Sequence, residues 1–299
     1  MRTRFLVAAA ATAAAVLVVL GQERGYAQEE VAPAAALVAG CPRASQELYP
    51  CAKAKAQAFN PPRFPDGTPD MQGAWIGLTA GSQNIEDFLV EDAYFFAKQR
   101  TLIVDPPDGK IPYQPWGLAQ RAKHLKEYID PFALCYPMGQ PRQMYGARGY
   151  HILQSPGRFA VVSEWAHVFR VIPTDGSPHI GKRIQLFMGD SRGHWEGKTF
   201  VIETTNLNNM TWFDIVGDFH SENLRVTERL TMIDIDTMLY EATMEDPAVF
   251  TRPWTMAFAI RRFEKGHEVL EEACYEGDRS VPNMMGAGYK PYIGLDRAK

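Results

Sequence analysis

The sequence lacks the short motifs that mark the common enzyme classes. It has no Gly-x-Ser-x-Gly elbow, no Walker phosphate loop and no Gly-rich dinucleotide fingerprint. None of its four cysteines belongs to a CxxC pair, and no Cys/His cluster has zinc-finger spacing. These absences argue against a serine hydrolase, a nucleotide-binding enzyme and a zinc protein. We therefore expect neither a resident cofactor nor a metal.

Positive charge is not concentrated anywhere in the chain. The formal net charge is −4 over 299 residues and there is no basic block, so nucleic acid is a poor candidate partner. Charges also interrupt every apolar stretch after the N-terminal one, which predicts no integral membrane span. The composition, 46% hydrophobic and 22% charged, is typical of a folded globular protein.

The N-terminus has the parts of a secretory signal peptide. Two arginines precede an apolar run over residues 5–20, which is short for a membrane-spanning helix. Gly-Tyr-Ala at residues 25–27 places small side chains at positions −3 and −1 of a possible cleavage site after Ala27. The pattern predicts a signal peptide over residues 1–27 and a mature protein that is periplasmic or secreted.

The four cysteines predict a disulfide framework, because an exported chain reaches an oxidising compartment. Cys41 and Cys51 close a short loop and are natural partners, which leaves Cys135 to join Cys274, although four cysteines allow three pairings. An alternative for Cys41 is lipidation, because Val-Ala-Gly-Cys at residues 38–41 resembles a bacterial lipobox. Charged residues separate this box from the apolar run, whereas a lipobox normally follows the run directly.

Alternating apolar and polar residues, separated by turn residues, predict many short strands. The expected strands span residues 71–78, 150–154, 158–165, 168–173, 183–188, 199–205, 222–232, 237–244, 254–262 and 268–275. Strands at this spacing favour a barrel or a sandwich. We expect a single β domain over residues 66–281, preceded by a Pro- and Ala-rich arm (28–65) and followed by a tail (282–299).

One accessory helix is expected over residues 115–128. Pro115 suits the first turn of a helix, where its missing N–H group costs nothing. Leu118, Ala122, Leu125 and Ile129 recur at helical spacing and would form the buried face.

Trp75, in a Gly-x-Trp context on the first predicted strand, resembles the lipocalin or calycin pattern. In that pattern the Trp closes the barrel floor and an Arg from a late strand packs on it, a role open to Arg261 or Arg262. A longer resemblance, to a widespread family of exported and mostly hypothetical bacterial proteins of about this length, runs from about Pro69 to Tyr275. It implies an antiparallel, lipocalin-like all-β barrel and no particular reaction. The segments that carry it are residues 69–75, 194–199, 206–214, 219–224, 227–229 and 245–254.

A long loop over residues 206–222 is the richest candidate for a functional site, because long loops over a barrel mouth often carry function. His220 could act as an acid or base, since only His titrates near neutral pH unperturbed, and Asp214 could orient it. Trp212 and Phe219 are candidate contacts for a substrate. Two alternatives stay open: a metal held by His220 and neighbouring carboxylates, or a capping loop without chemistry.

Strand alternation places Glu228 on an apolar face with Val226 and Leu230. A buried carboxylate must be paired or protonated. Glu228 is therefore an acid/base group with a raised pKa, which could meet His220 if the loop folds back, or the partner of an inward-facing Arg such as Arg170.

A second candidate set surrounds a predicted turn at residues 166–167. Glu164 and Arg170 could face each other across a hairpin with His167 at its tip, either as a catalytic group or as a surface ion pair. Trp195, Trp254 and Arg170 are further candidates for substrate contact, and for the two tryptophans the alternative is a place in the core.

These patterns predict an exported β-barrel, capped by a long loop, whose cavity accepts an apolar or aromatic small molecule. One hypothesis is cofactor-free acid/base catalysis, such as isomerisation, cyclisation, hydration or hydrolysis. The second is a non-catalytic periplasmic carrier, and the third is a structural module of the cell envelope. An enzyme needs at least two titratable groups within reach of one ligand atom, whereas a carrier needs a mainly apolar lining.

Overall fold

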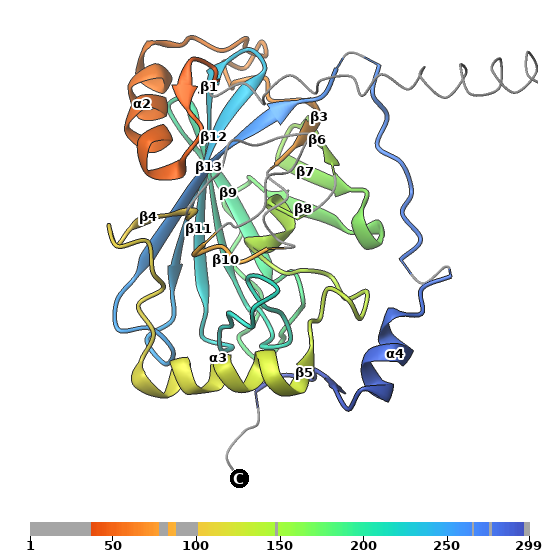
Figure 1. Ribbon diagram of the computed structural model, residues 1–299. Helices are drawn as coiled ribbons and strands as arrows, with labels where there is room; N and C mark the ends of the chain where they lie inside the picture. Colours follow the sequence, from red (N-terminus) through yellow and green to blue (C-terminus); the bar gives the residue numbers. More distant parts are fainter. Residues whose placement is uncertain are drawn as a thin grey trace, which may run out of the picture. The chain divides into compact units, whose positions relative to one another are not determined.

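A computed structural model describes residues 37–77, 83–87, 101–146, 149–264, 266–274 and 277–295, without the side chain of His167. The predicted signal peptide lies outside the described residues. Figure 1 shows a strongly curved sheet, with helix α2 (Ser45–Ala58) against its outer face and helix α3 (Pro115–Glu127) across one end. No helix in the described part of the chain is long and apolar enough to cross a membrane.

The sheet has ten strands. Nine follow the order β8-β7-β6-β3-β13-β12-β11-β10-β9, and β4 pairs with β13. Every pairing in this sheet is antiparallel. The bounds are β3 Gly73–Ile76, β4 Ile103–Asp105, β6 Gly149–Ser155, β7 Arg158–Ser163, β8 Phe169–Pro173, β9 Asp190–Glu196, β10 Thr199–Thr205, β11 Arg225–Asp234, β12 Thr237–Glu245 and β13 Trp254–Arg262.

The two end strands of this order, β8 and β9, come together and nearly close the sheet into a barrel. No ladder of backbone hydrogen bonds joins these two strands. Side chains join them instead, because Arg170 on β8 donates to the hydroxyl of Ser191 on β9 at 3.0 Å. The predicted all-β antiparallel barrel is confirmed. Large buried side chains from the strands and from the loop over residues 206–224 fill its interior.

Two of the predicted strands are absent, and several strands of the structure were not predicted. Residues 183–188 make only an isolated bridge, between Leu186 and Leu207, and residues 268–274 form no strand. The short β4 was missed, and β9 was read as a hairpin connection. β9 is rich in polar residues, and Gly193 faces the interior. A Cβ atom on Gly193 would lie 2.5 Å from the Phe200 ring, so the packing there leaves no room for an apolar side chain.

The segment expected as an arm contains helix α2 and a small hairpin of β1 (Leu37–Val38) and β2 (Cys41–Pro42). Leu48 and Ala52 of α2 pack on outward-facing side chains of β11, β12 and β13, which form a second small core on the outside of the barrel. The Lys53 ammonium and the Tyr49 hydroxyl both bond to the Glu241 carboxylate. Within the expected arm, the described residues 37–58 are thus packed on the barrel.

Helix α3 forms where it was predicted, but its apolar face was assigned wrongly. Leu118 and Leu125 are 54% and 53% exposed. Gly117 and His124 are the buried positions. The His124 ring stacks on Trp212 at a centroid distance of 5.2 Å, so an aromatic contact with the loop below sets the orientation of the helix. Near the end of α3, β5 (Tyr128–Ile129) pairs in parallel with β14 (Lys290–Pro291), which follows helix α4 (Ser280–Gly286).

Both predicted disulfides are present, Cys41–Cys51 and Cys135–Cys274. They fit an oxidising compartment. The thiol of Cys41 cannot carry a lipid while it is bonded to Cys51. The contact implied by the Gly-x-Trp pattern is also present, because the Arg262 guanidinium lies 4.0 Å from the centre of the Trp75 ring.

Candidate functional site

The loop over residues 206–224 covers one end of the barrel and fills it with side chains. Trp212, Phe213 and Phe219 are buried. The hydroxyl of Tyr113 accepts a hydrogen bond from the backbone N–H of Phe219 at 2.9 Å, which holds the tip of the loop. Trp254 is fully buried against Phe213. The aromatic residues predicted to contact a substrate, Trp195 apart, therefore belong to the core.

His220 is buried, and each of its two ring nitrogens makes a hydrogen bond with another group of the protein. Nδ1 lies 2.9 Å from the backbone carbonyl of Ser221, and a carbonyl only accepts, so Nδ1 carries the proton. Nε2 then accepts from the hydroxyl of Thr211 at 2.9 Å. Burial lowers the pKa of His220 and favours this neutral form. His220 is thus held as a neutral hydrogen-bonding residue, and it does not bond to Asp214.

Asp214 bonds to the backbone of its own surroundings. Its carboxylate accepts from the N–H groups of Ile85, Val216 and Asp218 at 3.0–3.2 Å. Burial raises the pKa of Asp214, although these hydrogen bonds oppose the shift. Through these hydrogen bonds the Asp214 carboxylate holds the loop backbone at Val216 and Asp218 and fastens it to Ile85.

Asp218 interacts directly with Asp214 and is equally buried. Burial, and then the neighbouring Asp214 charge, raise the pKa of Asp218 well above its usual value. Arg121 Nε lies 2.9 Å from Asp218 Oδ1 and opposes that rise. Arg121 also bonds to the Glu86 carboxylate at 2.8 Å. Arg121 on α3 therefore joins the carboxylates of Glu86 and Asp218 into one network between the helix and the loop.

Glu228 points into the barrel, as strand alternation predicted, and its partner is Arg170. The Arg170 guanidinium donates to both oxygens of the Glu228 carboxylate, and to the hydroxyl of Thr204 at 2.7 Å. The Tyr240 hydroxyl also donates to Glu228, at 2.8 Å. Of the two readings left open for Glu228, the structure contains the buried ion pair. Arg170, also a predicted contact for substrate, lies in the barrel interior with its guanidinium bonded to Glu228, Thr204 and Ser191.

Glu164 does not face Arg170 across a hairpin. Its carboxylate accepts from the backbone N–H groups of Gly149 at 2.9 Å and Leu270 at 3.0 Å, so it anchors the C-terminal segment to the start of β6. His167 lies in a short 3₁₀ turn, and its side chain is outside the described atoms. The expected Glu164–His167–Arg170 arrangement is therefore not assembled, because Arg170 belongs to the barrel interior.

One open cleft in the described part of the chain lies between the β6–β7 turn, the segment over residues 64–68 and neighbouring parts of β9 and β10. Its volume is about 600 Å³. Trp195 is half-buried at its edge, and its ring lies 4.9 Å from that of Phe200. Phe200 in turn stacks on Phe159 at 4.2 Å. Phe64 supplies a fourth ring, and the polar rim includes His194 and Arg158. We call this space the aromatic cleft.

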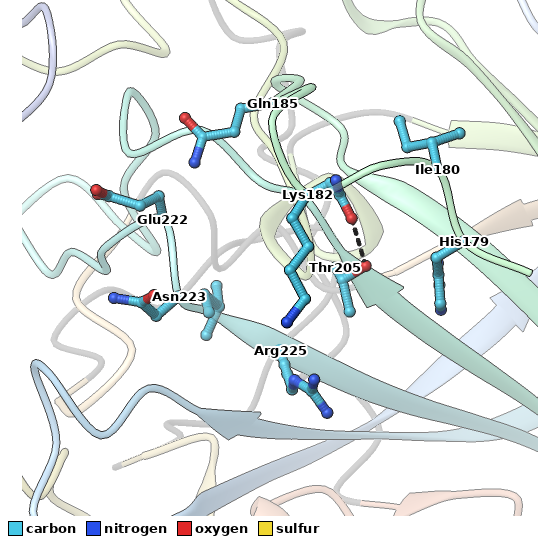
Figure 2. Close-up of a pocket in the computed structure, with 10 residues that line it drawn as sticks. His179, Ile180, Lys182, Gln185, Thr205, Glu222, Asn223 and Arg225 are labelled. Atoms are coloured by element: carbon cyan, nitrogen blue, oxygen red, sulfur yellow. Dashed lines mark hydrogen bonds between the residues drawn. The ribbon is translucent and has the colours of Figure 1, made fainter.

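A second cleft, which we call the polar cleft, lies between the β8–β9 connection and the start of β11. Its volume is about 450 Å³. Figure 2 shows its polar side chains, among them Lys182, Gln185, Asn223 and Arg225. None of the residues predicted as catalytic lines either cleft. Among the described residues, no group of His, Cys, Asp and Glu side chains is placed to hold a metal ion.

Sequence reasoning found Trp195 but missed the residues around it and the whole of the polar cleft. Phe200 shares the inner face of β10 with Ile202, a pattern visible in the sequence, but it reads equally well as core. Lys182 and Arg225 lie far apart in the chain, and no local pattern brings them together.

Comparison of the chain with protein-family models, with curated proteins and with solved structures found no match in any of the three. The function is therefore inferred from the geometry of the aromatic cleft and the polar cleft.

Proposed function

We propose that this is an exported, non-catalytic carrier that binds an apolar or aromatic small molecule in the aromatic cleft. The observation that carries the proposal is an open space of about 600 Å³ that the partly exposed rings of Trp195 and Phe64 line, with the buried rings of Phe159 and Phe200 packed behind them. Small-molecule sites are usually concave and mainly apolar, with few polar groups, and their volumes fall in this range. Stacking on Trp195 and Phe64 would hold a flat ring, while rim groups such as Arg158 orient it.

The proposal favours a carrier over an acid/base enzyme because the candidate catalytic groups do not converge on a cleft. His220, Asp214 and Glu228 are buried, and each has protein hydrogen-bond partners. A general acid or base must reach a proton on its substrate. The predicted signal peptide and the two disulfides together support a periplasmic or secreted location for this carrier.

The aromatic cleft can be tested with the fluorescent probe 8-anilinonaphthalene-1-sulfonate. We expect Trp195→Ala to raise the Kd of the probe about tenfold, because one stacking face is lost. Ser155→Trp should block the cleft from its exposed wall without disturbing the core. The matched control is Trp116→Ala, since Trp116 is 47% exposed on α3 and does not line the cleft.

If Ser155→Trp and Trp195→Ala bind the probe as tightly as the wild type, the probe does not use this cleft and the proposal fails. A ligand that co-purifies with the protein from the periplasm can be used to distinguish a carrier from an acid/base enzyme. After incubation with fresh protein and release, a carrier returns the ligand with unchanged mass, retention time and NMR spectrum. A changed mass, or an isomer of the same mass with a different retention time and NMR spectrum, would instead support the acid/base hypothesis if the change is lost in His220→Ala or Glu228→Gln.

A further inference from the structure

Two positively charged side chains share the polar cleft without a counter-ion. Lys182 comes from the β8–β9 connection and Arg225 from the first position of β11. In Figure 2 the Lys182 side chain extends toward that of Arg225. Neither side chain makes an ion pair or a hydrogen bond with another residue in the described part of the chain. Like charges that converge in this way attract an anion.

Two acidic groups near the polar cleft are engaged elsewhere. The Glu222 carboxylate points away from both cations in Figure 2 and accepts a hydrogen bond from Asn209 at 3.1 Å. One oxygen of the Asp190 carboxylate lies 2.7 Å from Nδ1 of His179. The other oxygen accepts a hydrogen bond from Arg192 at 2.7 Å. Glu245 lies opposite Arg225 on the paired strand β12, but no ion pair joins these two side chains, so neither Lys182 nor Arg225 has a bonded counter-ion among the described residues.

The remaining lining is suited to hydrogen-bonding groups on a small molecule. The Gln185 amide and the Asn223 side-chain carbonyl line the cleft and have no hydrogen-bond partner within the described residues. Asn206 is held in place by its own bonds, donating to the backbone carbonyls of Gly181 and Ile184. The buried Leu224 forms an apolar wall. Such a lining combines one charged end with amides that can bond to hydroxyl groups.

We propose that the polar cleft binds a small hydroxylated organic anion, with its carboxylate or phosphate group between Lys182 and Arg225. An Arg guanidinium and a Lys ammonium are the usual ligands of such groups, because their hydrogen bonds to oxyanions are charge-assisted. Gln185 and Asn223 bond to the hydroxyl groups of the ligand. The site is separate from the aromatic cleft, shares no lining residue with it and does not depend on the proposed carrier function.

The test uses the full mature protein and three probes: D-glucuronate, D-glucose 6-phosphate and uncharged D-glucose. Binding is followed by NMR titration at constant ionic strength, so that general screening does not change between points. We expect saturable shifts at the backbone amides of Thr205, Asn206 and Asn223 with at least one anion. Comparing glucuronate with glucose 6-phosphate shows whether the ligand is a carboxylate or a phosphate.

Lys182→Gln and Arg225→Gln should each weaken binding of the anion about tenfold, because each removes one charge-assisted contact. The matched control is Arg183→Gln, which removes an exposed cation next to Lys182 that does not line the cleft. Both substituted residues are exposed, so the fold should be unaffected. The proposal is overturned if neither anion gives saturable shifts, if glucose binds as tightly as the anions, or if Arg183→Gln weakens binding as much as Arg225→Gln.

Discussion

At the scale of single residues, the acidic pair in the loop governs how the protein responds to pH. Asp218 is buried beside Asp214, and both burial and the Asp214 charge raise the pKa of Asp218 well above its usual value. The folded state therefore holds a proton on Asp218 that the unfolded state releases at about pH 4. The stabilisation that this proton gives is complete below that pH and is lost as the pH rises through the folded-state pKa.

Asp218→Asn should remove this dependence, because an amide resembles a protonated carboxyl group and does not ionise. We expect the free energy of unfolding of the variant, relative to wild type, to grow as the pH rises above about 4. Urea unfolding at a series of pH values measures the difference. The lowered pKa of His220 affects both proteins equally and cancels. Asp66→Asn is the control with the opposite sign, since hydrogen bonds from Thr68 lower the pKa of Asp66. Parallel curves for wild type and Asp218→Asn would contradict the assignment.

Individual side chains also show what the sequence can reveal about a site. The alternation in β11 predicted that Glu228 points inward, because a strand places every second side chain on the same face. The alternation could not show whether Glu228 has a raised pKa or forms a buried ion pair, because its partner Arg170 comes from a strand that is distant in the sequence. Asp214 and His220 lie close together in the sequence, yet each bonds to other groups. Proximity along a loop does not determine which polar atoms meet.

At the scale of elements, the two disulfides tie peripheral segments to the barrel. Cys41–Cys51 joins the β1–β2 hairpin to α2 and spans a sequence separation of 10. Cys135–Cys274 joins the segment after β5 to the C-terminal segment, with a separation of 139. A crosslink over a longer loop removes more conformational entropy from the unfolded chain. The two bonds should therefore differ in their effect on stability.

Replacing both members of each pair by Ser tests this difference. We expect Cys135→Ser with Cys274→Ser to lower the free energy of unfolding by about 5 kcal/mol, and Cys41→Ser with Cys51→Ser by about 3 kcal/mol, in the chain-entropy model. Denaturant unfolding of the two variants and the wild type measures both values. A larger loss from the short-loop pair would show that packing of α2 on the barrel, rather than chain entropy, dominates.

The elements that the sequence predicted correctly are those with clear alternation. β10 and β13 have the predicted bounds because apolar side chains line one face of each strand. β9 was missed because Gly193 occupies an inward position where the pattern requires an apolar residue. In α3, helical periodicity selected Leu118 and Leu125, whereas stacking between His124 and Trp212 sets the buried face. Contacts between aromatic rings from distant segments are not encoded in local periodicity.

At the scale of the whole molecule, the predicted removal of the signal peptide and the two disulfides together define the mass expected for the mature protein. We expect protein recovered from the periplasm to begin at Gln28, after cleavage behind Ala27, and to contain no free thiol. Intact mass spectrometry measures both properties. Ala27→Arg should block cleavage and leave the precursor mass. A lipid on Cys41 in the membrane fraction would contradict the prediction, because that thiol would then be unable to bond to Cys51.

The seam between β8 and β9 has a consequence for how this architecture can change in evolution. Arg170 spans it through Ser191, Thr204 and Glu228, while the backbones of the two strands form no ladder. Closure is thus a property of a few side chains, each of which a single codon change can replace. A substitution of Arg170 or Ser191 would therefore remove the contact that joins β8 to β9 while leaving every backbone ladder of the sheet in place.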